Sequence, residues 1–73
     1  MIEDRIRKLR MNRKMTQAEV ATLLNVSTSA VGMYEQGRRV PSLELVVAYA
    51  ELFSVTTDYL LREEGRIEEI KCM

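Results

Sequence analysis

The chain has 73 residues, of which 47% are hydrophobic and 30% charged, and its eleven lysines and arginines balance eleven aspartates and glutamates. A chain of this length supports one small domain with little core to spare for an enclosed active site. Its composition lies well outside the disordered class. With no histidine and one cysteine, Cys72, the sequence predicts no internal disulfide, metal site or cofactor.

Two further features bear on membranes and secretion. The longest apolar run, residues 45–50, is far shorter than the 18 or so residues that a membrane span needs. Glu3 and Asp4 precede the first basic residues, which is unlike a signal peptide. We therefore expect a cytoplasmic protein that does not cross a membrane.

The charges are unevenly distributed along the chain. Residues 1–40 carry eight basic and four acidic side chains, whereas residues 41–73 carry three and seven. Zero net charge argues against a nucleic-acid partner, because affinity for phosphates comes largely from lysine and arginine. A polarised chain nevertheless presents a basic end to a polyanion. On charge alone, a basic end that binds a polyanion and chance clustering of charges on a solvated surface explain this distribution equally well.

Apolar residues at helical spacing predict a first helix over residues 2–12. A second helix begins at Thr16, since Thr16 and Glu19 have the spacing of a capping box. That helix stops at Asn25, a residue type that tolerates the left-handed conformation. The turn that follows is short, because Ser27 is placed to cap the next helix.

The third helix runs from Ser27 to a glycine stop at Gly37, and Pro41 and Ser42 open a fourth. Thr56 caps a short fifth helix. No alternation of apolar and polar residues predicts a strand. The expected fold is therefore all-α, with a five-helix domain over residues 1–61 and a charged C-terminal tail over residues 62–73, whose helicity the sequence leaves open.

The second and third predicted helices meet the requirements of a helix-turn-helix unit. Close approach of the two helices needs a small residue, which is Ala21. Asn25 reverses the chain, and Val26 and Val31 are placed to lock the helices together. The second helix of such a unit can enter the major groove of DNA.

In this light residues 5–61 resemble the DNA-binding domain of the phage repressor and Cro family throughout. The matching motifs are Thr-Gln-x-Glu-x-Ala, Asn-Val-Ser, Tyr-Glu-x-Gly and Pro-Ser-Leu-Glu, which are weak individually and specific in register. The resemblance implies a compact lambda-repressor-like domain that places its third helix, residues 27–36, in the major groove of double-stranded DNA.

The resemblance also implies residue roles. Base-facing positions correspond to Thr28, Ser29, Gly32 and Met33. Phosphate-contacting positions correspond to Thr16, Gln17, Ser27, Arg38 and Arg39. Arg10 and Glu35 correspond to an internal ion pair with a structural role.

The base-facing set contains no arginine, asparagine or glutamine, the side chains that make bidentate base contacts. Thr28 and Ser29 offer single hydrogen bonds, and Met33 offers an apolar contact to a thymine methyl. We therefore expect modest direct readout, with groove shape and deformability carrying a large share of specificity.

The fourth helix shows two apolar stripes. We assign residues 43, 46, 47, 50 and 53 to the core and the other stripe to a homodimer interface, because clustered exposed apolar surface usually marks a contact. The interface candidates are Leu45, Tyr49, Leu52, Tyr59 and Leu61. The alternative is that this stripe packs beneath the tail through Ile67 and Ile70.

These features predict a sequence-specific DNA-binding transcriptional regulator, most simply a repressor that acts as a homodimer. The alternative is a protein-interaction module on the same fold, such as an antitoxin or an antagonist that pairs with a regulatory protein. Gly32, Met33 and the neutral charge favour that alternative. An enzyme is disfavoured, since the sequence has no histidine, no Gly-rich phosphate loop and no activated cysteine.

Overall fold

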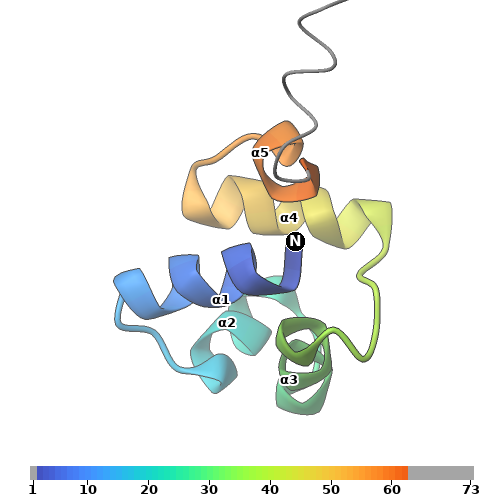
Figure 1. Ribbon diagram of the computed structural model, residues 1–73. Coiled ribbons are helices and arrows are strands. Elements are labelled where there is room, and N and C mark those ends of the chain that lie inside the picture. Colours follow the sequence, from blue (N-terminus) through green and yellow to red (C-terminus); the bar gives the residue numbers. More distant parts are fainter. Residues whose placement is uncertain (1, 63–73) are drawn as a thin grey trace, which may run out of the picture.

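The computed structural model describes residues 2–62, which form five helices and no strand (Figure 1). The helices are α1 (Ile2–Asn12), α2 (Gln17–Leu24), α3 (Thr28–Gln36), α4 (Leu43–Phe53) and α5 (Thr57–Leu61). The predicted all-α, five-helix fold is confirmed. Residues 63–73, which hold most of the predicted tail with Ile67 and Ile70, lie outside the described residues.

Capping side chains fix the helix ends where the sequence predicts them. The Thr16 hydroxyl accepts a hydrogen bond from the Glu19 amide, and the Glu19 carboxylate accepts one from the Thr16 amide, which completes the capping box. Asn25 and Gly37 end α2 and α3 in the left-handed conformation, with φ of 60° and 73°. Local signals therefore fix where α2 and α3 begin and end.

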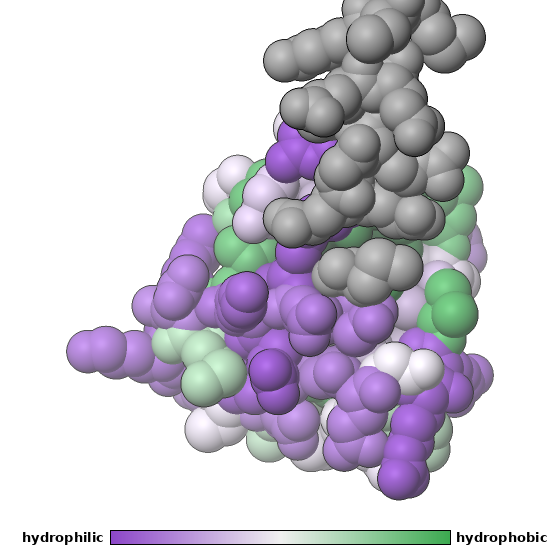
Figure 2. Space-filling view, viewed as in Figure 1, coloured by the Kyte–Doolittle hydropathy of each residue, from purple (hydrophilic) through white to green (hydrophobic). Residues whose placement is uncertain are grey.

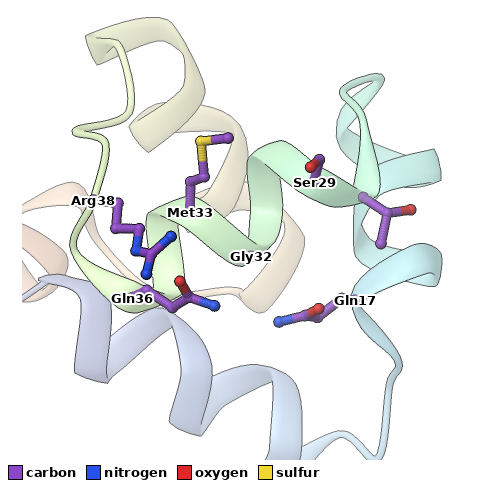
Figure 3. A pocket seen from close by; sticks show the side chains of 7 residues that line it. Gln17, Ser29, Gly32, Met33, Gln36 and Arg38 are labelled. Carbon is purple, nitrogen blue, oxygen red and sulfur yellow. The ribbon is translucent and has the colours of Figure 1, made fainter.

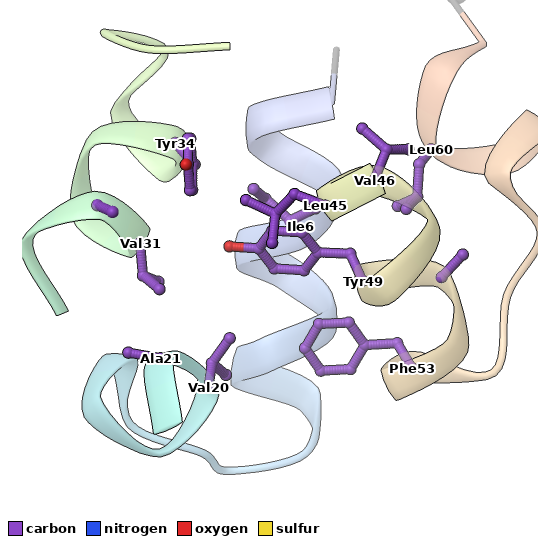
Figure 4. Packing of buried hydrophobic residues seen from close by; sticks show 12 residues of the cluster. Ile6, Val20, Ala21, Val31, Tyr34, Leu45, Val46, Tyr49, Phe53 and Leu60 are labelled. Carbon is purple, nitrogen blue, oxygen red and sulfur yellow. The ribbon is translucent and has the colours of Figure 1, made fainter. Parts of the chain in front are cut away.

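In residues 2–62 the core holds twelve buried hydrophobic residues drawn from all five helices (Figure 4). Tyr49 lies at its centre, fully buried, with its ring edge-on to Tyr34 at 6.5 Å between centroids and stacked near Phe53 at 6.2 Å. The contact between Tyr34 and Tyr49 joins α3 and α4. Figure 1 shows α3 and α5 at opposite ends of the molecule, with α1 and α4 between them.

The prediction for α4 is wrong in its orientation. Leu45 and Tyr49, predicted to face a partner, are buried, whereas Leu43 and Val47, predicted to be in the core, are 71% and 39% exposed. Helix α4 contacts α1, α2 and α5, and these three helices together cover a broad stripe of the α4 surface. At about 100° per residue, that stripe is rotated by roughly a fifth of a turn from the expected one. Leu52 is half-buried against the core.

The ion pair predicted between Arg10 and Glu35 is present and bidentate. Arg10 Nε donates to Glu35 Oε2 at 2.7 Å and Arg10 Nη2 donates to Glu35 Oε1 at 3.0 Å. Arg10 Nη1 also donates to the Met15 carbonyl oxygen at 2.8 Å. The hydrogen bond to Glu35 raises the pKa of the Arg10 guanidinium above its ordinary value. One side chain of α1 thus connects the loop before α2 with the last turn of α3.

Tyr49 has an unusual hydroxyl. It is buried and has no hydrogen-bond partner within residues 2–62. Burial, with the nearby Glu35 carboxylate adding to it, raises the pKa of Tyr49 well above its ordinary value, because both disfavour a phenolate. The hydroxyl therefore costs stability at neutral pH through its lost hydration.

We predict that Tyr49→Phe is at least as stable as the wild type at neutral pH. Its stability relative to the wild type should rise at alkaline pH. The pKa of Tyr49 is higher in the folded than in the unfolded chain. The contribution of Tyr49 to the free energy of unfolding is therefore complete below about pH 10 and falls as the pH rises further. Urea denaturation across this pH range measures the difference. Tyr59→Phe, at a partly exposed site, is the control and should follow the wild type. Parallel pH profiles for wild type and Tyr49→Phe would refute the prediction.

Breaking the Arg10–Glu35 pair from either side should have unequal effects. The Glu35 side chain is 3% exposed and the Arg10 side chain 15%, so Arg10→Met strands the more deeply buried charge. We expect Arg10→Met to lower the unfolding free energy by about 3–5 kcal/mol. Glu35→Leu should cost less, because Arg10 can reach water.

The double variant Arg10→Met with Glu35→Leu is the matched control, since it leaves neither charge unpaired. It should recover much of the lost stability. Denaturant titration of the three variants tests this order. A loss in the double variant equal to the sum of the two single losses would show that the pair is not coupled.

Candidate nucleic-acid interface

Helices α2 and α3 pack as a helix-turn-helix unit. Ala21 and Val31 are buried between them and the core, and Val26 is half-buried in the turn. The Val26 amide donates to the Ala21 carbonyl oxygen at 3.0 Å, which closes the turn at Asn25. The small, turning and locking residues predicted from the sequence therefore occupy the expected places.

One face of α3 is committed to the core and the other is open. Ala30, Val31, Tyr34 and Glu35 are buried. The predicted base-facing residues lie together on the outer face and line an open surface hollow of about 440 Å³ (Figure 3). The lining consists of Gln17, Thr28, Ser29, Gly32, Met33, Gln36 and Arg38. The outer face of α3 is thus available to a ligand.

Gln36 is the residue of this hollow that sequence reasoning missed as a site residue. Its spacing carries the missing signal: Gln36 lies four residues after Gly32, so both side-chain positions fall on one helix face. The structure places it beside Gly32 and Arg38 (Figure 3).

Thr16 and Ser27, predicted to contact phosphates, serve as helix caps in the structure. Each hydroxyl oxygen accepts a backbone hydrogen bond of 3.0 Å, from Glu19 and Ala30 respectively. A hydroxyl that accepts a bond keeps its own proton to donate. Capping therefore leaves both side chains able to donate to an anion.

Gln17 lies in the first turn of α2, beside α3. Its Nε2 donates to Glu35 Oε1 at 3.2 Å, and the same carboxylate oxygen accepts from Arg10 at 3.0 Å. The buried ion pair is therefore linked to a half-buried side chain at the edge of the hollow. This bond orients the Gln17 amide before any ligand arrives.

Arg38 and Arg39 follow α3 and are both exposed. Arg38 lines the hollow, whereas Arg39 is not among its lining residues. Both residues follow the end of α3 closely in the sequence, so both charges lie near its C-terminal end. An anion bound across this face would meet positive charge at the C-terminal end of α3.

Other kinds of site find little support in residues 2–62. Within this range no three histidine, cysteine, aspartate or glutamate side chains gather as a metal site. None of these helices has the length and apolarity that crossing a bilayer requires.

Comparison with known families supports the reading of the α2–α3 unit. Residues 6–60 match the family model described as Helix-turn-helix. That match covers all five helices except the ends of α1 and α5.

Curated relatives of the chain are regulators of transcription by name. The HTH-type transcriptional regulator AnsR of Bacillus subtilis is 39% identical over 61 residues, which cover 84% of this chain and 53% of AnsR. The HTH-type transcriptional activator BcrR of Enterococcus faecalis is 34% identical over 64 residues, which cover 88% of this chain and 31% of BcrR. The chain thus spans about half of AnsR and less than a third of BcrR.

Among solved structures, the chain resembles the P22 c2 repressor in complex with synthetic operator 9T. The TM-score is 0.81 at 29% identity, and the match covers 85% of this chain and 94% of that one. The solution structure of the DNA-binding domain of the same repressor gives a TM-score of 0.79. The fold, the α2–α3 geometry and these matches agree: the chain belongs to the helix-turn-helix family of phage repressor and Cro type.

Proposed function

We propose that the chain binds double-stranded DNA in a sequence-specific way, with α3 in the major groove, and so represses transcription. The outer face of α3 carries this proposal, because its exposed polar and small residues take no part in the core. A helix presented in this way fits the major groove, where base edges are distinguishable.

The surroundings of α3 support a polyanionic ligand. Gln17, at the start of α2, and Arg38, after the end of α3, lie at the edge of the hollow that the α3 face forms. Helix starts and arginine side chains are the usual ligands of DNA phosphates. The P22 c2 repressor, which has the same fold, was solved with a synthetic operator. We assign phosphate contacts to Thr16, Gln17, Ser27, Arg38 and Arg39.

We further propose that the chain pairs as a homodimer. With Leu45 and Tyr49 in the core, the surface for pairing is the exposed apolar set on α4 and α5, namely Leu43, Val47, Tyr59 and Leu61. Figure 2 shows a mainly hydrophilic surface over α1 to α3 and hydrophobic side chains toward α4. Two-fold pairing would present two α3 helices to successive major grooves, about 34 Å apart.

A protein-interaction module on the same fold is the second candidate. The exposed Met33 on the outer face of α3 favours it, because methionine is common at protein contacts. Salt dependence separates the two functions. Phosphate contacts release counterions, so DNA binding weakens steeply with salt, whereas a protein partner need not behave in this way.

We predict that affinity for a duplex selected from a random pool falls steeply with salt, and that Arg38→Ala and Arg39→Ala each reduce the slope of log K against log salt by about 1. Fluorescence anisotropy at several salt concentrations measures this slope. Arg62→Ala is the control, because Arg62 lies over the ring of Tyr59 in α5, and α5 and α3 lie at opposite ends of the molecule (Figure 1). Binding without salt dependence would overturn the proposed function.

Pairing is tested by removing apolar area from α4. The double variant Leu43→Ser with Val47→Ser should shift the monomer–dimer equilibrium toward monomer in sedimentation experiments, while the fold is retained because both side chains are exposed. Leu23→Ser, at an exposed position on α2, should leave the equilibrium unchanged. A wild-type chain that stays monomeric, both free and on DNA, would contradict the homodimer.

A further inference from the structure

We propose that Gln36 is a specificity-determining residue, whose side-chain amide reads an adenine in the major groove. This inference rests on the proposed function. It names a side chain that can make a bidentate contact to a base, which the predicted base-facing set lacks. The amide of glutamine can donate to N7 of adenine and accept from N6. Both contacts require that its nitrogen and its oxygen are free of other hydrogen bonds, so the surroundings of Gln36 determine whether it can make them.

Gln36 shares the open face of α3. Positions 28, 29, 32, 33 and 36 are spaced by one helical turn in two adjacent rows, and all five line the same hollow. The Gln36 side chain is exposed, and within residues 2–62 it makes no hydrogen bond. Gln17, the other amide of the hollow, is already bound to Glu35. Gln36 therefore has both its donor and its acceptor available.

Gly32, one turn before Gln36, leaves space for this side chain. Glycine inside a helix lowers helix stability relative to other residues. Close packing does not require it here, because an added Cβ would meet only the Gln17 amide, at 3.8 and 3.9 Å, which is ordinary contact. Long side chains on a helix lean toward its N-terminus. The Gln36 amide can therefore lie over Gly32, toward the middle of the α3 face.

The reach of Gln36 toward base edges depends on the length of α3 and on its own side chain. Nine residues give a helix about 13.5 Å long. In helix-turn-helix docking the N-terminal residues of this helix contact base edges, and a long side chain in the last turn leans toward that end. Thr28 and Ser29 offer single hydrogen bonds from the first turn, and Gln36 offers a pair from the last. Arg38, at the same edge of the hollow, can hold the adjacent phosphate.

The test compares wild type with Gln36→Met on the duplex that the wild type selects from a random pool and on all its single-base variants. Methionine keeps the length and helix preference of the side chain and removes only the amide. Circular dichroism confirms that each variant is folded. Arg38→Ala is the matched control, because loss of a phosphate contact weakens binding to every sequence alike.

We expect Gln36→Met to lose discrimination at one A·T pair by roughly 10- to 100-fold, with the other positions and the salt slope unchanged. Arg38→Ala should keep the wild-type base preferences and lose part of the salt slope. A Gln36→Met profile equal to the wild type at every position, or weakened uniformly, would overturn the inference while leaving the proposed function intact. A wild-type chain that selects no duplex would overturn both.

Discussion

The arrangement of the binding surface depends on one buried contact, the bidentate pair between Arg10 and Glu35. Glu35 lies on the core side of α3, so its attachment to α1 fixes the rotation of α3 about its own axis. The same guanidinium binds the Met15 carbonyl just before α2 begins. Because Gln17 also donates to Glu35, the contact extends from the core to the edge of the open α3 face.

A buried ion pair of this kind is better suited to orientation than to stability. Desolvation of both charges offsets much of their attraction, and apolar pairs of similar size often stabilise a fold as well. A fixed α3, however, needs directional contacts, and a bidentate guanidinium–carboxylate pair sets both distance and angle. The packing of Tyr34 and Tyr49 adds a second, non-polar link between α3 and α4. Together these contacts set which residues of α3 face outward.

The sequence is informative where structure is set by neighbouring residues. Thr16, Asn25 and Gly37 mark helix ends through local hydrogen bonds and left-handed backbone, so their positions are predictable. The rotation of α4 is different, because it depends on which helices cover it. Both of its faces are apolar in the sequence, and the contacts with α1, α2 and α5 and with Tyr34 of α3 decide that Tyr49 is buried and Leu43 exposed. Gln36 stands beside the helix end that Gly37 marks, and its place on the open face follows from its helical spacing to Gly32 and from the packing of α3.

The even charge balance is compatible with the proposed DNA contacts, because the basic side chains are concentrated in residues 1–40. We propose that the core fixes α3 so that its open face meets DNA. Amide chemical shifts recorded while a selected duplex is added test this most directly. We expect the largest shifts at Gln17, along α3 and at Arg38, with α5 little changed. Shifts confined to α4 and α5, with α3 unaffected, would contradict it.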